Sequence, residues 1–209
     1  MNSVNTNVGA LVALQNLNST NSELMSVQSR INTGKKIASA KDNGAIWAIA
    51  QNQRAASGAL NAVKDSLQRT QSTIDVAISA GESVSDILLQ MKEKALAASD
   101  TTLTTTSRNA LNEDFKSLRN QLAKAVATAE FNGANMIKTS GTTMMALANS
   151  DGTSKITVAA ANLGLGGGNV GVTATATIGT VTTAAAMITT VNNSIAAVST
   201  ALSKFGTGS

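Results

Sequence analysis

Residues 60–98 read LNAVKDSLQRTQSTIDVAISAGESVSDILLQMKEKALAA, and this stretch decides the fold. Apolar or small residues recur in it at alternating steps of three and four positions without a break, which places them on one seam of an α-helix. At ~1.5 Å per residue this helix would be roughly 58 Å long. We therefore predict a long rod in a coiled-coil-like bundle. The large seam residues of this helix are Leu60, Val63, Leu67, Ile74, Val84 and Leu88.

Two further stretches repeat the three-four spacing. Residues 107–130 begin at a candidate N-cap, Ser107, and end before Asn132-Gly133, two residues that tolerate the left-handed conformation. This helix would fold back antiparallel on residues 60–98. Residues 183–205 form the third helix, which ends at Gly206. The seam residues are Leu111, Phe115, Leu118 and Leu122 in the second helix and Ile188, Val191, Ile195, Val198 and Leu202 in the third.

The N-terminal region has a weaker helical pattern. Leu17, Leu24 and Ile31 recur every seven residues, but they stand among Asn, Ser, Thr and Gln, which are mediocre helix formers. We expect such a helix to form only when its apolar stripe has a partner. An irregular connection, residues 33–45, follows, and then a short helix that contains Trp47.

Residues 139–182 are the candidate β region. Two short runs, residues 144–149 and 155–158, flank Asp151-Gly152, a dipeptide that favours a hairpin turn. A Gly-rich loop and a weak Thr-rich strand, residues 172–178, come next. The chain is thus predicted to be mainly α, an elongated rod of long antiparallel helices with a small β-hairpin. Its predicted divisions are residues 1–32 (N-terminal helix), 33–45 (connection), 46–138 (rod helices), 139–182 (β region) and 183–209 (start of a C-terminal rod helix).

The composition excludes most catalytic and metal chemistry. The 209 residues include no Cys and no His, which removes thiol nucleophiles, Ser-His-Asp relays and the usual zinc ligands. Residues 166–171 match the dinucleotide-binding fingerprint by letter, but an alternating Thr/Ala strand pattern follows them where a helix is needed, and no acidic residue follows Asp151. Glu113 and Asp114 are neighbours on a helix and point about 100° apart, so they cannot flank one substrate. We predict no enzyme activity, no metal site and no cofactor.

The formal net charge of +4 comes mainly from one short patch, in which Arg30, Lys35, Lys36 and Lys41 are set against Asp42. Nucleic-acid binding would show a denser basic cluster, so no such partner is predicted. No run of about 18 apolar residues exists, so we expect no membrane insertion. No basic residue precedes Arg30, so the leader of a cleavable signal peptide is missing and secretion would need another route.

Three motifs resemble bacterial flagellins. Residues 30–54, RINTGKKIASAKDNGAIWAIAQNQR, resemble the signature near the N-terminus of that family. Residues 89–100, LQMKEKALAASD, resemble the end of the family's long rod helix, and Phe131-Asn132-Gly133 resembles the F-N-G after its second helix. The motifs agree in order and spacing, and the resemblance covers residues 1 to about 138. Residues 139–182 fall in the family's variable, outward-facing region.

The resemblance implies a structural subunit of the flagellar filament that polymerises with many copies of itself into a helical tube for motility. It also implies export of the unfolded chain by the flagellar type III system, a secretion chaperone, a filament cap and an extracellular location. Flagellins end in a further helical segment that pairs with the N-terminal helix. Because this chain stops at Ser209, we expect that segment to be absent from it.

We place the subunit contacts in the N-terminal helix and the connection, because the basic patch beside Asp42 has little else to pack on. Two alternatives stay open. One is a flagellin-like hook–filament junction protein, and the other, from a different class, is a monomeric helical binding module. The hypothetical contact residues are Leu17, Leu24, Arg30, Ile31, Lys35, Lys36, Ile37, Lys41 and Asp42.

Overall fold

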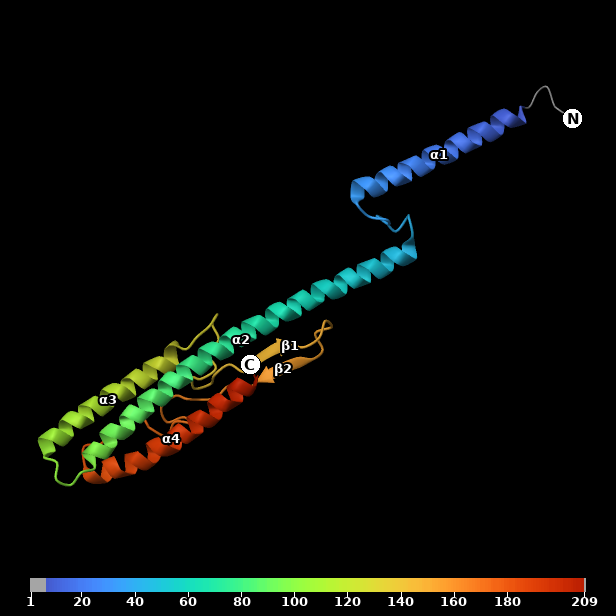
Figure 1. Cartoon of the computed structure of the whole chain (residues 1–209). Helices are drawn as coiled ribbons and strands as arrows, with labels where there is room; N and C mark the ends of the chain where they lie inside the picture. Colours follow the sequence, from blue (N-terminus) through green and yellow to red (C-terminus); the bar gives the residue numbers. More distant parts are fainter. Residues whose placement is uncertain (1–6, 209) are drawn as a thin grey trace. The chain divides into compact units, whose positions relative to one another are not determined.

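The computed structural model describes residues 7–208. It confirms the predicted class, mainly α with long helices and a small β-hairpin (Figure 1). The chain divides into two compact units, one up to Ala59 and one from Leu60 onward, which we describe separately. In chain order the elements are α1 (Val8–Thr33), α2 (Gly44–Ala98), α3 (Thr105–Thr128), β1 (Met144–Leu147), β2 (Lys155–Val158) and α4 (Val181–Gly208).

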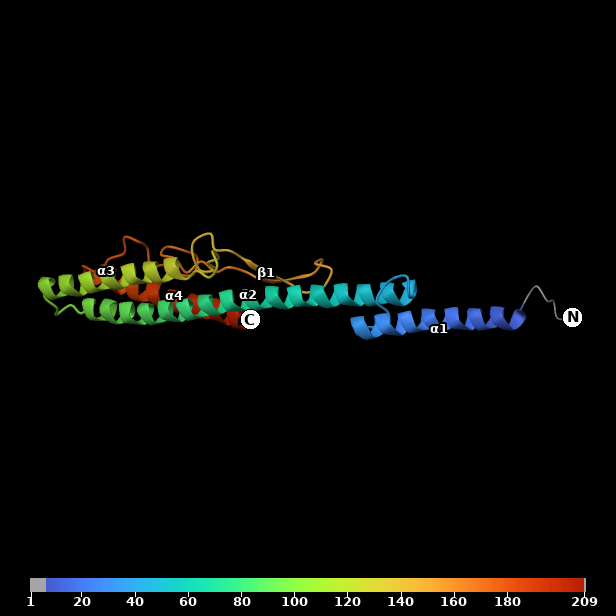
Figure 2. The ribbon, with the colours of Figure 1, turned by 90° about the horizontal axis from the view of Figure 1, so that it is seen from above.

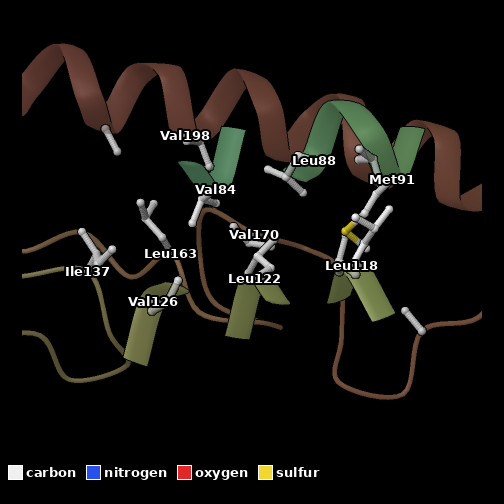
Figure 3. Packing of buried hydrophobic residues seen from close by; sticks show 14 of the residues in the cluster. Val84, Leu88, Met91, Leu118, Leu122, Val126, Ile137, Leu163, Val170 and Val198 are labelled. Carbon is white, nitrogen blue, oxygen red and sulfur yellow. The ribbon is translucent and has the colours of Figure 1, made fainter. Parts of the chain in front are cut away.

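The second unit is a three-helix bundle built on the predicted seams. Within it α3 and α4 both run back along α2 (Figures 1 and 2). Val84 and Leu88 of α2, Leu122 of α3 and Val198 of α4 are all fully buried in one cluster (Figure 3). Burial of apolar area at ~25 cal/mol per Å² is the main favourable term holding these helices together.

At Gly81 the side chain of Leu202 on α4 packs closely against α2. A Cβ atom at this position would lie 2.5 Å from Cδ2 of Leu202 and 3.5 Å from Cδ1 of Leu163. The absence of a side chain therefore lets Leu202 fill the space against the α2 backbone. A small residue in the middle of a long seam sets how near the partner helix can come.

The segment between β2 and α4 closes the bundle and is part of its core. Leu163, Val170 and Ile178 are fully buried although they lie outside any helix or strand. Side chains of the helices bind its backbone: Asn112 Oδ1 accepts from the N–H of Ile178 at 2.8 Å, and Arg119 Nη1 donates to the carbonyl of Ala176 at 2.8 Å.

The prediction of a strand over residues 172–178 is wrong. The described part of the chain holds one sheet, of two strands, and residues 172–178 are not part of it. Their backbone groups bond to helix side chains and to a local turn, in which the N–H of Ala176 donates to the carbonyl of Thr173 at 3.1 Å. Without a neighbouring strand, β propensity alone does not make a ladder.

The predicted hairpin is confirmed. Strands β1 and β2 pair antiparallel, with Met144 opposite Val158 and Leu147 opposite Lys155. Gly152 takes a φ of 69° in the connecting turn, a conformation that glycine adopts at no steric cost. Ser66 Oγ on α2 accepts from the N–H of Leu147 at 3.2 Å, which ties the hairpin to the rod.

Three predicted helix boundaries need correction. The predicted short helix around Trp47 and the helix of residues 60–98 are one continuous helix, α2, because no Pro separates them and the helix tolerates Gly58. The N-cap of α3 is Thr104 and not Ser107: Thr104 Oγ1 accepts from the N–H of Ser107 at 3.2 Å. Helix α4 continues past Gly206 to Gly208.

The large seam residues differ in how deeply they are buried. Leu60 and Leu67 lie exposed on α2. The end of α3 lies near residues 76–83 of α2, and α4 ends at Gly208. No helix of this unit therefore covers the turns of α2 that hold Leu60 and Leu67. The remaining ones are buried (Val63, Ile74, Val84, Leu88, Phe115, Leu118, Leu122, Val191, Val198) or half-buried (Leu111, Ile188, Ile195, Leu202).

Helix α4 is the element of the described chain that bears on the expectation about membranes. By length and composition it is apolar enough to span a bilayer, with a mean hydropathy of 1.2 over 18 residues. Its apolar character is spread over many Ala and Val residues and not concentrated in one unbroken run. Val191, Val198 and Phe205 are buried against the bundle, while polar residues such as Asn192 and Asn193 face solvent, as in an amphipathic helix of a bundle.

A buried arginine, Arg108, stabilises the turn between α2 and α3 by hydrogen bonds. Arg108 Nε donates to the carbonyl of Ala98 at 2.8 Å, and Nη2 donates to the carbonyls of Asp100 at 2.7 Å and Leu103 at 3.3 Å. The guanidinium thereby satisfies the last carbonyl of α2 and two carbonyls of the turn that follows it. The direction in which α3 leaves the turn is fixed by these bonds.

Replacement of Leu122 by Ala tests the packing of the bundle. The fully buried side chain of Leu122 leaves a cavity when truncated, so we expect the free energy of unfolding to fall by about 2–5 kcal/mol. Leu96→Ala is the matched control, because Leu96 is 59% exposed and its truncation should cost less than about 1 kcal/mol. Urea denaturation followed by far-UV circular dichroism measures both. Equal losses in the two variants would contradict the core described above.

Candidate functional site

Helix α1 presents its apolar residues to solvent. It runs from Val8 to Thr33 and none of its residues is buried. Leu24 is 62% exposed and Ile31 is 74% exposed. The large apolar side chains that α1 leaves exposed are Val8, Leu11, Val12, Leu14, Leu17, Leu24, Met25, Val27 and Ile31. An exposed set of this size along one helix is typical of an interaction surface.

Local capping defines both ends of α1. Asn7 Oδ1 accepts from the N–H of Ala10 at 3.1 Å, which satisfies one of the helix's free N-terminal donors. At the other end Gly34 adopts the left-handed conformation, with φ of 62°, and its N–H points to the carbonyl of Ile31 at 3.4 Å. Glycine is the usual residue here because it has no Cβ to clash.

Asp42 organises the connection between α1 and α2. Its Oδ2 accepts from the N–H groups of Ala38 and Ser39, each at 3.0 Å. The bonds from Ser39 and Ala38, together with a smaller contribution from the nearby charge of Arg30, lower the pKa of the Asp42 carboxyl below its ordinary value of 3.8. Asn43 then caps α2, since its Oδ1 accepts from the N–H of Ile46 at 3.1 Å.

The structure places the hypothetical contact residues together in the first unit. Ile37 is half-buried, and the others are exposed: Leu17, Leu24, Arg30, Ile31, Lys35, Lys36, Lys41 and Asp42. Sequence reasoning assigned Asp42 a role at the surface and missed its bonds to the backbone. The signal was available, because an Asp in an irregular connection commonly accepts hydrogen bonds from nearby backbone N–H groups.

The carboxylates that could be considered for catalysis have structural partners in the described part of the chain. The Asp42 carboxylate accepts backbone N–H groups, and Glu113 and Asp114 each form a salt bridge, with Lys116 and Lys94 respectively, both at 2.7 Å. Within residues 7–208 no three Asp, Glu, His or Cys residues are grouped to hold a metal ion. A helix with no buried residue, in a chain that also forms an ordered bundle, is typical of one class of protein, the structural helical subunit of an assembly.

Comparisons with known proteins name the family. Residues 4–142 match the family described as "Bacterial flagellin N-terminal helical region". Flagellin FljM of Caulobacter vibrioides is 58% identical over the whole chain, which covers 76% of that relative, and flagellin FljK of the same organism is 57% identical with the same coverage. Flagellin C of Rhizobium meliloti is 34% identical over 137 residues, which are 66% of this chain and 42% of that relative.

A protein of known structure has a similar fold. The crystal structure of Bacillus cereus flagellin matches with a TM-score of 0.59 and 21% identity, over 69% of this chain and 82% of that chain. The chain belongs to the bacterial flagellin family, and it is a structural subunit of the flagellar filament.

Lowering the pH tests the turn that Asp42 holds. Because the folded-state pKa lies below 3.8, the turn is fully stabilised above that pH and loses this stabilisation as the pH falls through the lower, folded-state value. We expect the Asp42 carboxyl to titrate below 3.8 by NMR, with the amide resonances of Ala38 and Ser39 moving at the same midpoint. In Asp42→Asn those two resonances should no longer titrate. A midpoint at or above 3.8 would contradict the bonds to Asp42.

Proposed function

We propose that α1 and the connection of residues 34–43 form the contacts between subunits of the filament. The single observation that supports this proposal most strongly is the exposure of nine large apolar side chains on α1. Covering such a surface removes apolar area from water at ~25 cal/mol per Å², and in a polymer neighbouring copies can supply the covering surface. The contact residues are Leu17, Leu24, Arg30, Ile31, Lys35, Lys36, Ile37, Lys41 and Asp42.

We further propose that the chain leaves the cell unfolded through the flagellar type III system, without a cleavable signal peptide, and assembles beneath the filament cap. A secretion chaperone would shield its apolar helices before export. The lack of Cys and Pro is compatible with export as an extended chain. After export no disulfide has to form and no proline peptide bond has to isomerise before the chain folds. The role is purely structural and involves no catalytic step and no cofactor.

Substitutions in the connection test the proposed contacts. The gene is expressed as the only flagellin in a strain of its own species, and Asp42→Ala and Arg30→Ala are compared with the unmodified chain. We expect both variants to shorten or abolish filaments in electron micrographs and to reduce swimming. Asp42→Ala loses two backbone hydrogen bonds that shape the connection, and Arg30→Ala loses a charge at the proposed contact.

The control separates assembly from export and folding. Both variants should be secreted in normal amounts and keep the helix content of the unmodified chain, because the substituted side chains are exposed. Arg69→Ala, an exposed arginine outside the proposed contact, should leave filaments unchanged. Normal filaments and full motility from both Asp42→Ala and Arg30→Ala would refute the assignment of this segment.

A further inference from the structure

Helix α2 carries a line of acidic side chains on its solvent face. Asp75, Glu82, Asp86 and Glu93 are spaced by seven, four and seven residues, so they project from α2 within about 20° of one direction. All four are exposed. At ~1.5 Å per residue they span about 27 Å of the helix. We call these four residues the acidic line.

Within residues 7–208 no salt bridge involves the acidic line. The sequence has no Lys or Arg between Thr70 and Met91, the stretch that holds Asp75, Glu82 and Asp86, while Glu93 stands between Lys92 and Lys94. The salt bridges of the described residues join Lys94 to Asp114 and Lys116 to Glu113. Like charges four residues apart on a helix, as at Glu82 and Asp86, are unfavourable. Soluble surfaces usually mix both signs of charge, so a face of one sign is a feature that a partner can use.

The complementary charge lies in the first unit of the same sequence. Arg30, Lys35, Lys36 and Lys41 are exposed, and none of them takes part in the salt bridges of the described residues. The carboxylate nearest to them in sequence, Asp42, accepts two backbone N–H groups. Three of these cations lie on the connection that Asp42 organises and Arg30 lies in the last turn of α1, so four cations match the four anions on α2. We call these four cations the basic connection.

We propose that the basic connection of one copy docks on the acidic line of a second copy in the filament. The proposal rests on the proposed function, in which copies pack through α1 and residues 34–43, and it adds the surface that receives the connection. Exposed charges farther apart than about 8 Å are largely screened at physiological salt, so the two sets must meet directly. Charge pairs of this kind fix the register of a contact and exclude wrong partners more than they add affinity. The acidic line thus selects how one copy is placed on the next.

Charge reversal in the strain that has this chain as its only flagellin tests the proposal. One variant combines Lys35→Glu with Lys36→Glu, and another combines Glu82→Lys with Asp86→Lys. We expect each pair alone to reduce mean filament length at least about tenfold, because like charges then face each other. All four substitutions in one chain should restore the length. Secreted amounts and circular dichroism show that export and folding are unchanged.

Co-expression of the chain with the reversed connection and the chain with the reversed acidic line distinguishes contacts between copies from contacts within one copy. If the basic connection meets a second copy, each reversed chain supplies what the other lacks, and a mixture should form longer filaments than either chain alone. If the four-substitution chain restores assembly and the mixture does not, the pairing lies within one copy and the proposal is overturned.

A matched control removes the effect of net charge. Glu130→Lys with Asp151→Lys makes the same change in charge at exposed carboxylates away from the acidic line. This pair should leave filaments intact and should not rescue the reversed connection. Rescue by this pair, or normal filaments from either reversal alone, would overturn the proposal. If the unmodified chain is secreted and forms no filaments, the proposed function itself has failed, and this inference fails with it.

Discussion

The structure depends on one constraint: each amphipathic helix has an apolar stripe that must be covered. In the second unit the chain covers its own stripes, because Leu88 of α2, Phe115 of α3 and Val198 of α4 are fully buried in one cluster. In α1 no residue is buried. The same kind of stripe is covered in one unit and open in the other, and under the proposed function neighbouring copies cover the open one.

Polar side chains set the direction of the chain at the places where helices end. Arg108 binds three carbonyls in the turn after α2, and Asp42 binds two N–H groups in the turn before it. Both side chains form hydrogen bonds with backbone groups that have no partner within a helix. A long helix held at both ends in this way can present its outer charges at fixed positions, which suits a subunit whose neighbours must be placed in register.

The spacing of apolar residues predicts much of the fold, and the features that it does not predict lack such a spacing. Phe115, Leu122 and Val198 could be assigned to the core because a three-four spacing has only one geometric solution in a helix. Leu163 and Val170 were missed because an irregular segment among glycines has no period to reveal which side chains turn inward. The cap at Thr104 was misplaced because several Ser and Thr residues stand together, and only the observed hydrogen bond selects one.

The most direct test of the account uses the absence of cysteine from the chain. In Leu24→Cys the new thiol lies on α1, and in the control Thr153→Cys it lies in the hairpin turn, where Thr153 is exposed. Maleimide labelling is then timed in disassembled subunits and in filaments. The account predicts that Cys at position 24 reacts rapidly in subunits and at least about tenfold more slowly in filaments, while Cys at position 153 reacts alike in both. Equal labelling of position 24 in the two states would contradict the claim that neighbouring copies cover α1.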